Sequence, residues 1–233
     1  MREKASLELE KQFKQLSREV QQVKDVIKGK AETDNRINEI YKGTMILYSN
    51  LIDNPDFMFI GINPGAGYYN ETNNIEKRID FRPINEFEYV TSEGENWDYS
   101  LAKETRDVFK KSKYYNKFSR SVKTNVIFTS THNIVDYEKL YSLLIEEYEI
   151  NMYQYAKKWI IELIGMVKPK VIICEGAKAF NFLSEWYSIQ FSWVNNIAKG
   201  TLVDGITFIA YKRNHSHILN REGLLTRINS LRL

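Results

Sequence analysis

The chain has 233 residues, of which 43% are hydrophobic, 13% aromatic and 27% charged. This composition is typical of globular proteins and excludes disordered and fibrous ones. A single cysteine, Cys174, excludes an internal disulfide framework, and with only three histidines beside it we expect no metal and no cofactor. No window approaches the roughly 18 apolar residues of a membrane span, and no signal-peptide core is present, so we expect a cytoplasmic protein without a membrane partner.

The formal net charge is +3, and its distribution is uneven. Residues 199–233 carry six basic and two acidic side chains, so this segment is locally basic. Such an excess is either a face that meets a polyanion or ordinary solvated charge.

The first predicted element is an amphipathic helix over residues 3–28, with Gly29 as the residue that ends it. Its apolar positions alternate spacings of four and three, as in a short coiled coil. We therefore divide the chain into a helix at 1–30 and a domain at 31–233. The apolar seam packs either in a homodimer or against the domain. It consists of Leu9, Phe13, Leu16, Val20, Val23 and Ile27.

The rest of the chain predicts an α/β fold. A second helix is expected from Thr33 or Asp34 through Leu47. Continuous apolar runs are typical of strands buried on both faces, and strands that alternate with helices indicate a parallel sheet of about four strands covered on both sides. Residues 68–97 fit neither pattern and are expected to form a long loop. The runs are 57–60, 125–128, 171–174 and 206–210, and the intervening helices are 98–112, 136–148, 151–167, 177–187 and 220–230.

Ligands bind beyond the carboxyl ends of parallel strands, so the residues that follow each run are candidate site residues. The first run leads into a glycine-rich turn at 61–69, and the others lead into 129–133, 175–177 and 212–220. The turn lacks the phosphate-loop patterns, and no nucleophile elbow is present. Cys174 lies inside a buried run and is interpreted as a structural thiol.

The segment Gly61-Ile62-Asn63-Pro64-Gly65 resembles the first active-site motif of the uracil-DNA glycosylase superfamily, in the form of its mismatch-specific uracil/thymine branch. His215-Ser216-His217-Ile218-Leu219-Asn220 is similar to the second motif. The segment Lys168-Pro169-Lys170, the following strand and Gly176-Ala177 resemble a third segment of these enzymes, as does Thr124-Asn125-Val126. The likeness spans about 55–231.

The resemblance implies a three-layer α/β/α domain that flips a uracil-type or mismatched base out of DNA and hydrolyses its N-glycosidic bond without a cofactor. Asn63 would hold the attacking water, although an amide cannot act as a general base. The base would lie against the motif residues and stack on Tyr68 or Tyr69. The motif residues are Gly61, Ile62, Pro64 and Gly65.

The resemblance assigns His215 as the donor to the departing pyrimidine, and His217 competes for that role. A different register would match Asn214 and Ser216 to the motif and leave no histidine donor. The first register makes Leu219 the wedge that fills the vacated stack and Asn220 the cap of the last helix. The base edge would be read by Asn125, or by Thr129 or Asn133.

The expected partner is double- or single-stranded DNA, with its phosphates held by Lys212, Arg213, Arg221 and Arg227. Two rival hypotheses remain. One is a catalytically inactive member of the superfamily that only binds nucleic acid or a protein partner. The other is a nucleotide or nucleoside binder, which would leave the basic C-terminal residues without a polyanion.

Overall fold

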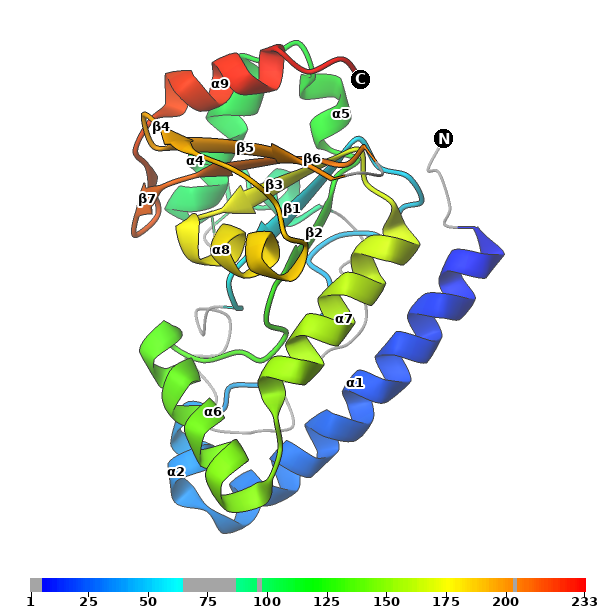
Figure 1. Cartoon of the computed structure of the whole chain (residues 1–233), viewed down its shortest axis with the longest axis vertical. Helices are drawn as coiled ribbons and strands as arrows, with labels where there is room; N and C mark the ends of the chain where they lie inside the picture. The colour runs from blue at the N-terminus through cyan, green and yellow to red at the C-terminus, as the bar shows by residue number, and fades with distance from the viewer. Residues whose placement is uncertain (1–5, 65–86, 96–97, 203–204) are drawn as a thin grey trace.

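The computed structural model describes residues 6–64, 87–95, 98–202 and 205–233. It is a mixed α/β structure with a central six-stranded sheet between helices, and α1 (Leu7–Thr33), α2 (Asn35–Ile40) and α6 (Ile134–Tyr148) extend below the sheet in the view of Figure 1. The predicted α/β class and the long N-terminal helix are confirmed. Most of the 68–97 segment, with Gly65, Tyr68 and Tyr69 of the predicted site, lies outside the described residues.

The sheet has six strands in the order β2-β1-β3-β6-β5-β4, rather than about four. The first four are parallel to one another, and β5 and β4 extend the sheet from β6 in antiparallel pairing. Strands β1, β3 and β6 are almost wholly buried, which is why their sequences are mostly apolar runs. The strands are β1 (Phe57–Gly61), β2 (Val122–Asn125), β3 (Val171–Glu175), β4 (Trp193–Val194), β5 (Ile197–Thr201) and β6 (Thr207–Tyr211).

The second strand begins earlier than the apolar run at 125–128 predicted. Strand β2 includes the polar residues Lys123 and Thr124, both buried. The apolar run continues beyond the strand, and its backbone still bonds to the end of β1, from Val126 N to Gly61 O. Its side chains then enter a core shared with the helices, where Phe128 stacks on Trp159.

Helices cover both faces of the sheet (Figure 1). One apolar cluster joins β1, β3 and β6 to α4, α5 and α9, and a second joins the opposite face to α1, α6, α7 and α8. The five helices predicted between and after the runs are all present. The helices of the domain are α2 (Asn35–Ile40), α3 (Glu88–Thr91), α4 (Ser100–Lys110), α5 (Tyr115–Phe118), α6 (Ile134–Tyr148), α7 (Met152–Val167), α8 (Ala177–Trp186) and α9 (Arg221–Asn229).

The N-terminal helix α1 (Leu7–Thr33) packs along α7, which is one of the two arrangements expected for its seam. Five of its six seam residues are buried there, and Glu19 accepts hydrogen bonds from Lys158 and Trp159 of α7. Gly29 does not end the helix. The helix ends at Asp34, whose side chain caps α2 instead, and α2 stops at Ile40 rather than near Leu47. Within the described ranges, no helix combines the length and apolarity needed to cross a membrane.

Candidate functional site

The carboxyl ends of the four parallel strands form one row of residues on the face covered by α4 and α9. Gly61 pairs in register with Asn125, and Glu175 pairs with Tyr211. Because Ile60 pairs with Cys174, the next positions along β1 and β3 place Gly61 beside Glu175. The row therefore reads Asn125, Gly61, Glu175 and Tyr211 across β2, β1, β3 and β6.

Gly61 makes room for the Asn125 side chain. A Cβ on Gly61 would collide with Asn125 Oδ1 and would lie 3.6 Å from Glu175 Oε2. Asn125 is only 5% exposed, yet its amide forms no hydrogen bond with the described residues. A nearly buried amide with free donors and an acceptor can read the edge of a planar ring.

Glu175 is the buried charge of this edge, and sequence reasoning assigned it no role. Its side chain is 1% exposed and forms an ion pair with Lys123 Nζ at 3.0 Å. The Tyr89 hydroxyl donates to its other oxygen. Burial, and after it the Glu175 carboxylate, raise the pKa of Tyr89 well above its ordinary value, so the phenol keeps the proton it donates. The sequence does contain a signal for Glu175, because it is an acidic residue directly after a wholly apolar run.

A second carboxyl group lies beside this network. Glu88 of α3 is buried, and among the described residues its Oε2 has no hydrogen-bond partner. Burial raises the pKa of Glu88, although the attraction of Lys123 opposes the rise. Burial and the charge of Glu88 also raise the pKa of Tyr99.

Asn63 follows β1 by two residues and has a defined amide orientation. Its Nδ2 donates to Thr131 Oγ1 at 3.0 Å and to Pro64 O at 3.3 Å. The Thr131 hydroxyl gives its one proton to Asn133 O at 2.7 Å, so its oxygen must accept from Asn63. This places the nitrogen of the Asn63 amide toward Thr131 and leaves Oδ1 as a free acceptor within the described part of the chain.

The turn around Asn63 is fastened to the chain that follows β2. Ile62 O accepts from Ile127 N, and Pro64 O accepts from the Ser130 hydroxyl. Thr129 is buried, and its hydroxyl has no hydrogen-bond partner among the described residues. It forms an isolated bridge with Thr44, so it belongs to the structure that holds the turn rather than to the row at Asn125.

The predicted second motif forms a small hairpin after β6. Its strands are β7 (Arg213–Asn214) and β8 (His217–Ile218). His215 lies in the turn with a left-handed φ of 52°, and its ring is exposed and bonded to none of the described residues. Arg213 donates to the His215 carbonyl at 2.9 Å, which stabilises the turn.

Glu104 of α4 anchors this hairpin, and sequence reasoning missed it. It accepts hydrogen bonds from His217 Nδ1 at 2.7 Å, from Ile218 N at 2.6 Å and from Arg221. Burial alone would raise the pKa of Glu104, but the bonds from His217, Ile218 and Arg221 outweigh it and hold that pKa below its ordinary value. No local pattern identified Glu104, because its partners lie more than 100 residues away in the chain.

The residues after the hairpin begin the last helix as predicted. The Asn220 side chain accepts from Gly223 N at 2.8 Å and caps α9. Leu219, just before the cap, is 52% exposed. An exposed leucine beside a helix N-terminus is compatible with the wedge role.

The four predicted phosphate contacts have different surroundings. Arg221 is paired with buried Glu104, and Arg213 is bonded within the hairpin. Lys212 lies over the Trp193 ring, 5.1 Å from its centroid. Arg227 is exposed on α9 and lines a groove beside β5, which is three strands from β1 in the sheet.

Cys174 is buried in β3, and burial raises the pKa of its thiol, so it stays protonated. No group of three metal-ligating side chains occurs among the residues that the structure describes. No model of a known protein family matches the chain, and no curated protein is significantly similar to it.

Proposed function

We propose that the chain is a DNA glycosylase-like protein of the uracil-DNA glycosylase superfamily, which flips a uracil-type or mismatched base and hydrolyses its N-glycosidic bond. The observation that carries the proposal is a pair of amides at the carboxyl edge. Among the described residues, Asn63 Oδ1 accepts no hydrogen bond, and the Asn125 amide over Gly61 has no hydrogen-bond partner. Helices on both faces of the sheet support the three-layer arrangement that the resemblance implies.

In the proposed reaction, Asn63 Oδ1 accepts a hydrogen bond from a water molecule. This bond orients a lone pair of the water oxygen toward C1′ of the sugar. The N-glycosidic bond breaks with its electron pair going to the base, and the water oxygen then bonds to C1′. The amide cannot take the proton, so the proton passes to solvent. Catalysis therefore depends on stabilising the departing base anion.

Two groups would stabilise that anion. The Asn125 amide is available to the edge of the base, and its nitrogen can donate to a pyrimidine oxygen. His215 supplies the second donor in this proposal. His217 is bonded to Glu104, whereas the His215 ring is unpaired among the described residues, which favours His215 over His217 as the donor.

The experiment is a single-turnover assay on duplexes with G·U, G·T or hypoxanthine lesions, with chelator present and alkali cleavage as the readout. We expect Asn63→Ala to abolish base release while DNA affinity is retained, because the amide acts on water rather than on phosphate. Asn116→Ala, at an exposed asparagine of α5, is the matched control and keeps full activity. Failure of the unmodified protein to release any base would refute the proposal.

The two registers of the second motif make opposite predictions. We use His215→Gly, because glycine adopts the left-handed φ of this turn without strain. If His215 is the donor, its loss lowers the rate by about 10²–10³, and Ser216→Ala changes little. A large effect of Ser216→Ala with a small effect of His215→Gly would favour the other register.

The alternative is a catalytically inactive member that only binds nucleic acid or a partner. The bonding and burial of the two carboxyl groups at this edge favour this alternative, because neither group is placed to act as a general base. One oxygen of Glu175 accepts a hydrogen bond from Tyr89 and the other accepts one from Lys123. Glu88 is buried, and its pKa is raised by that burial. DNA affinity that falls steeply with salt, without base release, would support this alternative.

A further inference from the structure

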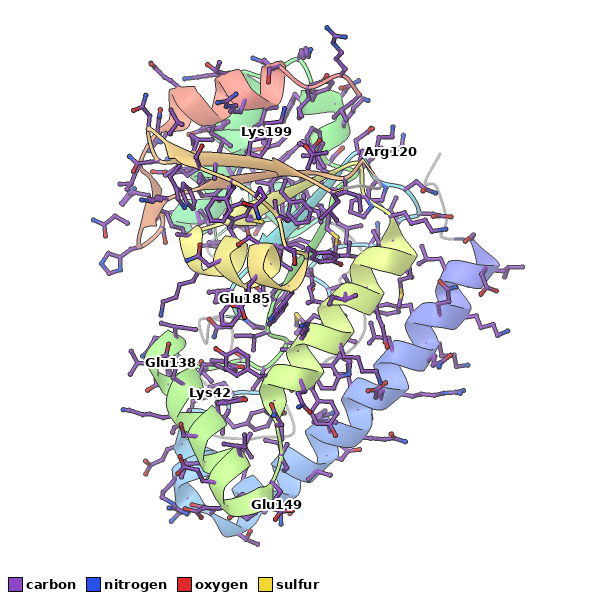
Figure 2. All side chains as sticks on the ribbon, in the orientation of Figure 1. Lys42, Arg120, Glu138, Glu149, Glu185 and Lys199 are labelled. Carbon is purple, nitrogen blue, oxygen red and sulfur yellow. The ribbon has the colours of Figure 1, made fainter. Side chains whose placement is uncertain are left out.

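A groove runs along the outer side of β5, between this strand, residues 190–194 and α9. Its volume is about 390 Å³. Polar side chains line most of it, and Lys199 of β5 lies beside α9 at this edge of the sheet (Figure 2). The lining includes Gln190, Ser192, Lys199, Thr201 and Arg227.

Gly200 determines the shape of the groove. A Cβ at this position would collide with Ile189 Cγ2 and lie 3.6 Å from Gln190 O. The missing side chain lets residues 189–190 lie against β5, and Gln190 lines the groove. The backbone of β5 and Gln190 therefore shape the groove, and its polar side chains are exposed to solvent.

The described residues that line the groove carry two positive charges and no carboxylate. Lys199 and Arg227 take part in no ion pair with the described residues. The Gln190 amide and the hydroxyls of Ser192 and Thr201 add hydrogen-bond donors. A concave surface with two cations and neutral donors suits a phosphate group.

This groove lies away from the Asn63 turn across the sheet. Strand β5 is three strands from β1, which is roughly 14 Å at about 4.8 Å between neighbouring strands. Lys199 pairs with Ile209 in the middle of β6, whereas Tyr211 at the end of β6 belongs to the row beside Glu175. A phosphate held by Lys199 and Arg227 would therefore differ from those around a nucleotide flipped toward Asn63.

We propose that the groove is a second phosphate site, which holds a backbone phosphate of a nucleic-acid strand outside the base pocket through Lys199 and Arg227. The choice of a nucleic-acid strand as the source of that phosphate rests on the proposed function. The same cations and hydrogen-bond donors of the groove could also bind the phosphate of a small ligand.

The test compares two double variants of the full chain by fluorescence anisotropy with a labelled oligonucleotide. Lys199→Gln/Arg227→Gln is expected to weaken binding of every sequence alike and to lower the slope of log K against log salt by about 1. The control Lys139→Gln/Lys157→Gln removes the same charge from exposed positions on α6 and α7. Equal losses in the two double variants would overturn the proposal, and circular dichroism checks that both fold.

A second measurement separates this proposal from the glycosylase proposal. Base release at saturating DNA is expected to be unchanged in Lys199→Gln/Arg227→Gln, because neither side chain lies at the carboxyl edge. If the unmodified protein binds no oligonucleotide, NMR titrations with inorganic phosphate and a nucleoside 5′-monophosphate decide. Saturable shifts at residues 190–201 that the double variant loses would support a site for small phosphates. The absence of such shifts would overturn the groove as a phosphate site.

Discussion

The charged residues at the carboxyl edge and those in the groove beside β5 differ in how they are paired. Lys123 is buried against Glu175, and Arg221 and His217 share the buried carboxylate of Glu104. Lys199 and Arg227 have no acidic partner within the described residues. The comparison indicates that these paired charges at the carboxyl edge stabilise the fold, whereas the charges in the groove are available to bind a ligand.

We expect the largest loss of stability from replacing Lys123. Lys123→Met leaves the Glu175 carboxylate buried without its counter-charge, and we expect a loss of about 3–5 kcal/mol in the free energy of unfolding. Lys199→Met removes an unpaired surface charge and should change it by no more than about 0.5 kcal/mol. Urea unfolding at pH 7 measures both.

The double variant Lys123→Met/Glu175→Leu sharpens the test. It removes both charges, so it should recover much of the stability that Lys123→Met loses. Similar costs for Lys123→Met and Lys199→Met would contradict the distinction between the two regions.

The anchor of the β7–β8 hairpin should have the next largest effect. Glu104→Gln weakens bonds from a histidine, a backbone N–H and an arginine, and we expect a loss of about 1.5–3 kcal/mol. Because folding lowers the pKa of Glu104, its contribution is present above the ordinary value of 4.5 and is lost as pH falls through the folded pKa. Unfolding curves at several acidic pH values should converge for the variant and the unmodified chain. A gap of constant size would contradict this account.

Pairing between residues far apart in the chain explains which strands could be predicted from the sequence and which could not. Strands β1, β3 and β6 are apolar on both faces, so their own residues identify them. Strand β2 contains Lys123, and its burial depends on a carboxylate 52 residues further along the chain. A local pattern cannot show that partner, so the strand was placed a few residues too late.

Strands β4 and β5 were missed although a local signal was present. Asn195 and Asn196 separate the two strands, and both have a left-handed φ. Two asparagines between short apolar pairs are typical of a tight β-hairpin. In the candidate site, the motif identified Asn63 and the cap Asn220, whereas Glu104 and Glu175 depend on contacts between distant elements.

Gly61 tests whether the Asn125 amide must lie over β1. Gly61→Ala introduces a Cβ that collides with Asn125 Oδ1, and we expect a loss of about 1–2 kcal/mol from overpacking. Gly165→Ala is the control, because a Cβ there meets nothing within 4 Å and its position in α7 should make alanine stabilising by about 0.5–1 kcal/mol. Thermal unfolding of both variants measures the difference. A neutral Gly61→Ala would show that Asn125 moves aside at little cost.

Glu88 should give the smallest effect, with the opposite sign. Burial raises its pKa above the ordinary value of 4.5, so the folded chain binds this proton more tightly than the unfolded chain does. Stability therefore falls as pH rises from about that value toward the folded pKa, and the loss persists above it. Glu88→Gln keeps the shape without the charge and should raise the free energy of unfolding at neutral pH by about 1 kcal/mol or less. Urea unfolding between pH 4 and pH 8 should show a flatter profile for the variant, and an unchanged slope would mean that Glu88 is not the group responsible.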